Sequence, residues 1–261
     1  MLRLLLARME PEKQRTYREL ANAHTTNRIT PLLGVLRTNA IMLPEQVWRK
    51  TWPGNTSEDD EKLSGVCEVL SRINHSCRPN AVVDFHIPSF TYVLTAARTI
   101  PAGTEITRTY IENAEPAADR QLALRPYGFR CRCAACASPR VSDLRRWQIV
   151  KDACEPLPAV RAWMRDPALT DDHLIRVSKR VLQLGQEEGM EASAGFYGAH
   201  LLQLTLSYAA LGERERYLEA RERMLALGRC HHPLDGQLTG WLLPKVPEEQ
   251  VVWGHRVPAL D

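Results

Sequence analysis

The sequence has no long hydrophobic run and almost no net charge. Its apolar stretches are short, as in Leu4–Ala7, whereas a membrane-spanning helix needs about 20 consecutive apolar residues. Arg8 ends the first apolar stretch before it reaches the roughly 7 to 15 residues of a secretory signal. The net charge of +3 is too small to indicate nucleic-acid binding by itself. We therefore expect an intracellular protein without a membrane span, located in the nucleus or in the cytoplasm.

The rest of the composition is that of an ordinary globular protein. Hydrophobic residues make up 44% and charged residues 25% of the 261 positions. These values exclude a mostly disordered chain, a collagen-like fibre and a disulfide-rich miniprotein. The length corresponds to one large domain or two modest ones.

Hydrophobic periodicity predicts helices in residues 1–24 and short strands in the middle of the chain. Pro11 is suited to the first position of the second helix, where a backbone N–H is not needed. Residues 32–43 are apolar and fit either a helix or a strand. Alternating apolar side chains then predict three short strands, which we expect to form a small antiparallel unit, at residues 82–87, 92–97 and 106–110.

From residue 142 to about residue 228 the pattern is helical. Four apolar stripes recur at helical spacing and begin at Trp147, Leu174, Tyr197 and Tyr217. Three of them are followed by a glycine, a common helix stop, at Gly185, Gly212 and Gly228. Paired helices of this length suggest tetratricopeptide-like (TPR-like) hairpins, although no clean repeat of about 34 residues is present. Residues 231–261 are rich in Pro and Gly and are predicted to form a packed irregular tail.

The cysteines indicate a metal site. Seven is an odd number, and clustered cysteines in an intracellular chain indicate metal binding before disulfides. Cys131, Cys133 and Cys136 form a C-x-C-x-x-C pattern that supplies three thiolates to a tetrahedral zinc ion. Cys77 is the strongest candidate for the fourth ligand. The other cysteines are predicted to be small buried side chains: Cys67, Cys154 and Cys230.

Three segments carry a family resemblance. Residues 71–80 read SRINHSCRPN, residues 100–110 read IPAGTEITRTY, and residues 127–133 read YGFRCRC, with Cys136 following. In this order they resemble the N-H-S-C-x-P-N motif, the Gly-x-Glu strand ending in tyrosine, and the post-SET segment of SET-domain protein methyltransferases. The resemblance covers about residues 65–140. Residues 38–40 and the helical C-terminal half resemble, less strongly, the MYND-associated (SMYD-like) subgroup with a split SET domain.

The resemblance implies an α+β fold. We expect a partial SET (β-clip) domain with a post-SET zinc site, followed by an all-helical TPR-like C-terminal module. The expected divisions are a helical insert and loop in residues 1–64, SET core strands in residues 65–115, the post-SET zinc segment in residues 116–140, and the helical module in residues 141–261.

The resemblance also implies an activity, which is S-adenosylmethionine-dependent methylation of lysine in a histone or another protein. The residues that would contact the cofactor are Asn39, Ser71, Asn74, His75 and Phe129, with Phe129 stacked on the adenine. Tyr110 would lie at the methyl-transfer channel and Tyr127 would line the lysine tunnel. Cys77 follows the cofactor-binding residues directly, so zinc would tie the post-SET loop to the cofactor pocket.

The sequence departs from the family pattern before Asn39. No Gly-x-Gly loop for the methionine part of the cofactor occurs there, and no MYND cysteine cluster is present. We therefore expect a fragment, a truncated gene model or a degenerate homologue, with an incomplete pocket that binds the cofactor poorly. The alternative function is a non-catalytic SET-derived scaffold that binds protein partners through its helical C-terminal half.

Residues 120–146 contain seven arginines and one acidic residue, Asp143. Arginine suits phosphate contacts, but such a stretch is more typical of a solvated surface. Nucleic acid is therefore not an expected partner.

Overall fold

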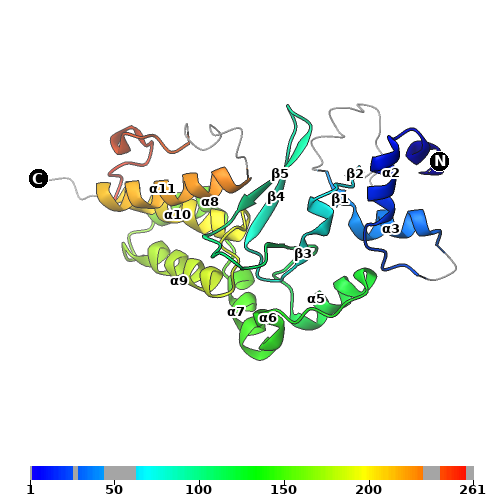
Figure 1. The fold of residues 1–261 in the computed structure, drawn as a ribbon. Coiled ribbons are helices and arrows are strands. Elements are labelled where there is room, and N and C mark those ends of the chain that lie inside the picture. The colour runs from blue at the N-terminus through cyan, green and yellow to red at the C-terminus, as the bar shows by residue number, and fades with distance from the viewer. Residues whose placement is uncertain (1, 26–28, 44–62, 232–241, 257–261) are drawn as a thin grey trace, which may run out of the picture.

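The computed structural model describes residues 2–25, 29–43, 63–231 and 242–256. Figure 1 shows short strands in the middle of the molecule, with the N-terminal helices on one side and the longer C-terminal helices on the other. None of the described helices is both long and apolar enough to cross a membrane. The acidic run at residues 58–61 lies outside the described residues.

The N-terminal part is helical, as predicted. It contains α1 (Leu2–Ala7), α2 (Pro11–Arg18) and α3 (Pro31–Asn39). Pro11 begins α2, and the Thr30 hydroxyl accepts a hydrogen bond from Leu33 N at 3.4 Å to cap α3. The ambiguous apolar stretch becomes a helix followed by β1 (Ile41–Met42), which pairs antiparallel with β2 (Ser64–Gly65). These helices share a small core of Leu6, Tyr17, Leu20 and Val35.

The predicted hairpin is confirmed, but the third strand pairs differently. The strands that follow β2 are β3 (Asn74–His75), β4 (Ala81–His86), β5 (Thr91–Ala96) and β6 (Thr107–Arg108). β4 and β5 are antiparallel, whereas β6 pairs with β3 in parallel. The Asn80 side chain explains this pairing, because it donates to Glu105 O and accepts from Thr107 N, both at 2.8 Å. The 105–108 segment is therefore bonded to the 74–80 loop and not to β5.

A helical region follows the strands, as predicted. Its helices are α5 (Ala117–Leu124), α6 (Ala134–Ala137), α7 (Pro139–Lys151), α8 (Pro156–Arg165), α9 (His173–Glu187), α10 (Phe196–Ala210) and α11 (Arg214–His231). Most residues of α10 are buried, because α10 packs against α8, α9 and α11. The resulting core includes Leu201, Leu204, Tyr208 and Tyr217, which lie on the predicted third and fourth stripes. The TPR-like character of these helix pairs stays a prediction.

Only one of the three predicted glycine stops is correct. Gly212 has a φ of 68°, and Glu213 N donates to Tyr208 O, which is the hydrogen bond of a Schellman helix end. Gly185 lies inside α9, where an added Cβ would be 2.8 Å from the Tyr197 ring. α9 ends instead at Gly189, which has a φ of 63°. α11 continues three residues past Gly228 to His231.

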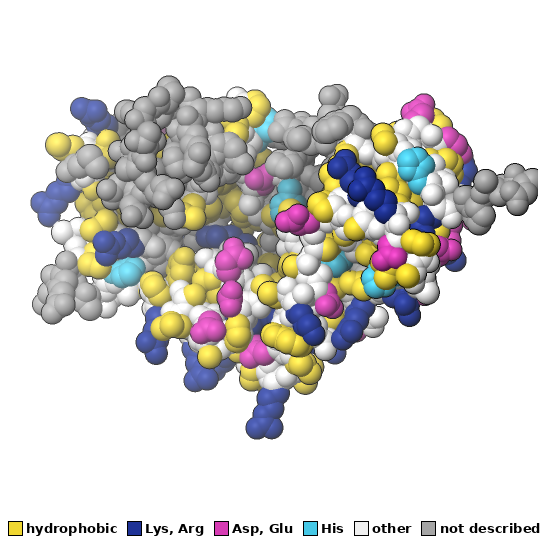
Figure 2. Space-filling view, turned by 180° about the vertical axis from the view of Figure 1, so that it is seen from behind, with side chains coloured by type: hydrophobic (Ala, Val, Ile, Leu, Met, Phe, Trp, Pro, Cys, Tyr) yellow, Lys and Arg dark blue, Asp and Glu magenta, His cyan; other side chains and the backbone are white. Residues whose placement is uncertain are grey.

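The first predicted stripe is wrong. Trp147 is 57% exposed, and α7 instead buries Ser142, Arg146 and Ile149. Hydrophobicity does not reveal this face because two of its three buried side chains are polar and are hydrogen-bonded to Glu188. Figure 2 shows apolar side chains mixed with Lys and Arg along the lower edge of the molecule, where Figure 1 places α6 and α7.

The described part of the tail, residues 242–256, is irregular and packed, as predicted. Its Arg256 side chain lies over the Trp163 ring at 4.4 Å from the ring centroid and donates to Leu169 O at 2.7 Å. Arg256 N also donates to Ala210 O at 2.8 Å, at the end of α10. Residues 232–241 and 257–261 lie outside the described residues.

Leu204 offers a test of the helical core. It is 2% exposed, so Leu204→Asp buries an unpaired charge and should lower the free energy of unfolding by several kcal/mol. Leu144→Asp is the matched control, because Leu144 is 57% exposed on α7 and its change should cost about 0.5 kcal/mol or less. Chemical denaturation followed by circular dichroism measures both, and equal midpoints would show that Leu204 is not a core residue.

Candidate functional site

The pairing of β3 with β6 brings the first two sequence motifs together. Asn74 lies opposite Thr107, and His75 lies opposite Arg108. Two residues after Arg108, Tyr110 N donates to His75 Nδ1 at 3.0 Å. The Tyr110 hydroxyl donates to Ile73 O at 2.5 Å. Tyr110 is therefore held against the first motif at both its backbone and its hydroxyl.

The third motif adds aromatic rings to this junction. The Tyr127 ring centroid lies 4.9 Å from that of Tyr110, and the Phe129 ring lies 6.0 Å from His75. Gly128, between the two aromatic residues, has a φ of 73°, which L side chains rarely adopt. An added Cβ at Gly128 would also lie 3.2 Å from Ala23 Cβ. Glycine thus allows the chain to turn where both aromatic rings face the junction.

A cavity of about 440 Å³ is surrounded by the predicted functional residues. Six of the seven residues assigned to the cofactor or to catalysis line it: Asn39, Ser71, Asn74, Tyr110, Tyr127 and Phe129. His75 does not line it, but contacts Tyr110 and Phe129 from behind. Residues far apart in sequence therefore converge on one hollow.

Two of these residues have clear structural partners. The buried Asn39 amide donates to Ala21 O at 2.6 Å and to Val35 O at 2.7 Å. The Ser71 hydroxyl donates to Asn39 O at 3.0 Å. The Ser71 side chain thus fastens the N-terminal segment to the first motif, whereas the Asn39 side chain holds that segment together internally. Asn74 is exposed and donates to Glu105 Oε1 at 2.6 Å, at the open side of the cavity.

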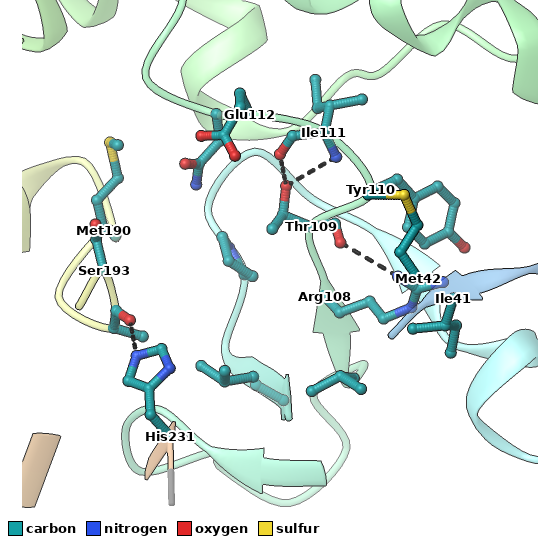
Figure 3. Close-up of a pocket in the computed structure, with 17 residues that line it drawn as sticks. Ile41, Met42, Arg108, Thr109, Tyr110, Ile111, Glu112, Met190, Ser193 and His231 are labelled. Atoms are coloured by element: carbon teal, nitrogen blue, oxygen red, sulfur yellow. Dashed lines mark hydrogen bonds between the residues drawn. The ribbon is translucent and has the colours of Figure 1, made fainter. Parts of the chain in front are cut away.

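A second cavity, of about 650 Å³, lies on another side of Tyr110. Strands β1 and β4, residues 108–113 and the connection between α9 and α10 contribute to its wall. Figure 3 shows Arg108 and Tyr110 on one side of this cavity, and Met190, Ser193 and His231 on the opposite side. Tyr110 lines both cavities. Burial raises the pKa of Tyr110, so its hydroxyl remains protonated at neutral pH.

The four predicted metal ligands form one cluster. The Sγ atoms of Cys77, Cys131, Cys133 and Cys136 all lie within 4.8 Å of one another. Cys77 Sγ is 3.9 Å from Cys131 Sγ and 3.6 Å from Cys136 Sγ. Four thiolates around zinc at about 2.3 Å have sulfur atoms about 3.8 Å apart, so the donor atoms and their spacing fit a tetrahedral metal.

Hydrogen bonding among these thiols favours a negative charge. A hydrogen bond from Cys77 lowers the pKa of Cys133 to about 3, and the same contact, with burial, raises the pKa of Cys77. A bound metal would replace the shared protons and bind all four sulfur atoms as thiolates.

His75 connects the cysteine cluster to the aromatic rings. Its Nε2 lies 3.3 Å from Cys77 Sγ. Burial lowers the pKa of His75 to about 4, so the ring is neutral at pH 7. Because Nδ1 accepts from Tyr110 N, the ring proton must be on Nε2, facing the sulfur. A shift of Cys77 would therefore be transmitted to the Tyr110 backbone.

The sequence reasoning missed three arginines at the site. Arg120 and Arg146 are each 1% exposed, so the arginine-rich stretch is not simply a solvated surface. Arg120 Nη2 lies 3.8 Å from Cys136 Sγ, and Arg146 Nη2 donates to Cys77 O at 3.0 Å. Arg108 lies over the Tyr110 ring, 4.4 Å from its centroid. The excess of arginine was visible in the sequence, but nothing in it distinguished buried from exposed members.

Comparison with known proteins gives a consistent result. Residues 9–111 match the family model for the SET domain. Histone-lysine N-methyltransferase set5 of Schizosaccharomyces pombe is 31% identical over 144 residues, which are 53% of this chain and 40% of that protein. Histone-lysine N-methyltransferase SMYD3 of Mus musculus is 30% identical over 113 residues, 41% of this chain and 26% of that protein. Protein-lysine N-methyltransferase SMYD4 of Mus musculus is 38% identical over 90 residues, 33% of this chain and 11% of that protein. The chain therefore spans less than half the length of these relatives.

Cys133 offers a test of the metal site. The purified protein should contain about one metal ion per chain, because four thiolates complete one tetrahedral site. Cys133→Ser should lose most of that metal, as measured by elemental analysis. Cys230→Ser is the control, because Cys230 Sγ is outside the cluster and contacts Ala96 O at 3.7 Å. Full metal content in the Cys133 variant would contradict the assignment.

Arg146 offers a test of the buried charges. Its Nε lies 3.1 Å from Glu188 Oε2, and both side chains are buried. Arg146→Met leaves this carboxylate without its main partner and should lower the free energy of unfolding by about 3 kcal/mol. Arg145→Met removes a half-exposed arginine from the same carboxylate and should cost about 1 kcal/mol or less. Urea denaturation measures the free energy of unfolding of both variants. If both lose a comparable amount, burial does not distinguish the two ion pairs with Glu188.

Proposed function

The chain contains a SET domain of the SMYD-like type in residues 9–111, and on that premise we propose that it is a protein-lysine N-methyltransferase that uses S-adenosylmethionine. The observation that carries the proposal is the position of Tyr110 between two cavities. One cavity is surrounded by the residues that the family resemblance assigns to the cofactor. The other is lined by the same tyrosine and would give a protein substrate access to it.

The smaller cavity would hold the cofactor, which supplies a methyl group on a positively charged sulfur. Its volume lies within the range of about 300 to 1,000 Å³ of small-molecule sites. Phe129 offers an aromatic face for the adenine, and Asn74 offers an exposed amide. Ser71 and Asn39 would shape the wall through their own hydrogen bonds. His75 would support the site from behind, through Tyr110 and Phe129.

Tyr110 would orient the reacting lysine. Its hydroxyl stays protonated at neutral pH, so it can position an amine by hydrogen bonding but is not a base. Ile73 O, which already accepts from this hydroxyl, fixes its direction. Tyr127, 4.9 Å away, would line the lysine tunnel and exclude water. Most of the rate gain would come from alignment of the uncharged amine with the methyl group.

The cysteine cluster would hold a structural zinc ion. All four positions of a tetrahedral site are filled by protein ligands, which leaves no open position for catalysis. The ion would hold the post-SET segment against the first motif and keep Tyr127 and Phe129 at the cavity. Arg120, buried beside Cys136, would offset part of the negative charge of four thiolates on one divalent ion.

The helical module, residues 141–261, would contribute to substrate binding. Residues 189–193 and His231 already form part of the wall of the larger cavity.

We assign the preceding divisions as a helical insert and loop in residues 1–64, the SET core in residues 65–115 and the post-SET segment in residues 116–140. The TPR-like character of the module would also suit further protein partners. Protein substrates in the nucleus or the cytoplasm fit this activity.

A non-catalytic scaffold is the second candidate function. It is favoured by the open side of the smaller cavity, where Asn74 and Phe129 are both exposed. Calorimetry with S-adenosylmethionine separates the two candidates. Micromolar binding would support the enzyme. The scaffold would be supported if S-adenosylmethionine binds neither to this chain nor to a chain extended with any coding sequence upstream of Met1.

Substitutions at Tyr110 and His75 test the assigned roles. Tyr110→Phe should lower the turnover of a lysine peptide about 100-fold or more while cofactor affinity stays nearly unchanged, because a positioned hydrogen bond at the reacting amine is lost. His75→Ala should do the reverse and weaken cofactor binding first. Methylation assays and calorimetry on both variants measure this division. Equal effects on turnover and affinity in the two variants would contradict separate roles.

A further inference from the structure

Arg108 lies on the wall of the larger cavity. Among the residues that the structure describes, no carboxylate lies within ion-pair distance of its guanidinium. Its Nη1 donates only to the neighbouring Thr109 O, at 3.3 Å. Its Nε is buried and has no acceptor among the described residues. Buried arginine nitrogens normally have partners, so this side chain retains unused donors.

The surroundings of Arg108 do not supply the missing charge. Burial lowers the pKa of Arg108, and the side chains that act in the opposite direction, Tyr110, Tyr127 and Cys67, include no carboxylate. The Tyr110 ring, 4.4 Å from the guanidinium carbon, holds the side chain in place by a cation–π contact. Glu112 lines the same cavity but is exposed and does not pair with Arg108 (Figure 3). A positive charge is thus fixed at the cavity, and no acidic side chain among the described residues pairs with it.

The position of this charge relative to Tyr110 indicates what it would meet. The Arg108 guanidinium carbon lies 4.4 Å from the Tyr110 ring centroid, and residues one or two positions apart in an extended chain are separated by about 3 to 7 Å. An extended substrate that places its lysine at Tyr110 therefore brings a side chain one or two positions away to Arg108. The cofactor's own carboxylate is a poorer match, because Arg108 lines the larger cavity and is not part of the smaller one.

We propose that Arg108 is a specificity-determining residue that binds an Asp or Glu side chain within two positions of the target lysine. This inference rests on the proposed function and names its substrate class, an acidic protein segment. A carboxylate accepts two parallel hydrogen bonds from a guanidinium, and the terminal nitrogens of Arg108 would donate them. Lysine in place of Arg108 would supply the charge but not this paired geometry.

A peptide library tests the proposal. Each peptide has one central lysine and one varied position, which is one or two residues before or after that lysine. At this position the acidic peptide carries Asp or Glu, and its neutral counterpart carries Asn or Gln. The wild-type protein should methylate the best acidic peptide about tenfold more efficiently than its neutral counterpart, in kcat/KM. Arg108→Gln should abolish that preference, so that the variant methylates the acidic and the neutral peptide with equal kcat/KM. Arg140→Gln, which removes an exposed arginine outside the cavity, should keep the preference.

Two further measurements keep the test decisive. The acidic preference of the wild-type protein should shrink as salt is raised, which requires no variant. Arg108→Lys should retain only part of the preference. An equal rate for acidic and neutral peptides in the wild-type protein, or an unchanged preference in Arg108→Gln, would overturn the proposal.

Peptide binding separates this inference from the proposed function. Fluorescence anisotropy with the same labelled peptides reports binding without turnover. If the wild-type protein binds acidic peptides more tightly than neutral ones, if Arg108→Gln loses this difference, and if no peptide is methylated, the role of Arg108 is supported and the enzyme is rejected. Methylation without any acidic preference would support the enzyme and reject the role of Arg108.

Discussion

The contacts of Cys77 hold three separate parts of this protein together. Its Sγ lies beside His75 on one side and beside Cys131 and Cys136 on the other. Its carbonyl oxygen accepts from Arg146 of α7 at 3.0 Å. The residue is fully buried, so none of these contacts is made through water. The aromatic junction, the cysteine cluster and the helical region therefore depend on the position of a single residue.

This arrangement gives the cysteine cluster a role beyond local folding. Binding energy at a closed metal site is also folding energy, because the site does not exist in the unfolded chain. The segment with Tyr127 and Phe129 is joined to α5 by the Gln121 side chain, which holds Cys131 through two hydrogen bonds. Loss of the proposed metal would therefore loosen two walls of the smaller cavity before it affected the helical core.

Charge is distributed around the site in an uneven way. Arg146 is compensated by Glu188, and Arg120 lies between Asp143 and the Cys136 sulfur. Arg108 has no such compensation among the described residues. Removing the partner of a buried charge costs several kcal/mol, because the remaining charge is left uncompensated. This difference distinguishes Arg120 and Arg146, which are held by acidic partners, from Arg108, which lines the larger cavity.

The sequence by itself determined the chemical groups of the site and the local structure. The four cysteines, the aromatic residues of the second and third motifs, the 81–96 hairpin and the Gly212 helix end could all be predicted, because each depends on residue type and short spacing. The tertiary structure alone decided the parallel pairing of β3 with β6, the burial of Arg120 and Arg146, the exposure of Trp147 and the helix stop at Gly189. It also placed Tyr110 on the walls of two cavities and Arg108 beside no carboxylate of the described residues. These outcomes depend on contacts between segments about 25 to 70 residues apart, such as Asn80 with Thr107 and Cys77 with Arg146. Local periodicity carries no information about which distant residue forms a hydrogen bond with a given polar group.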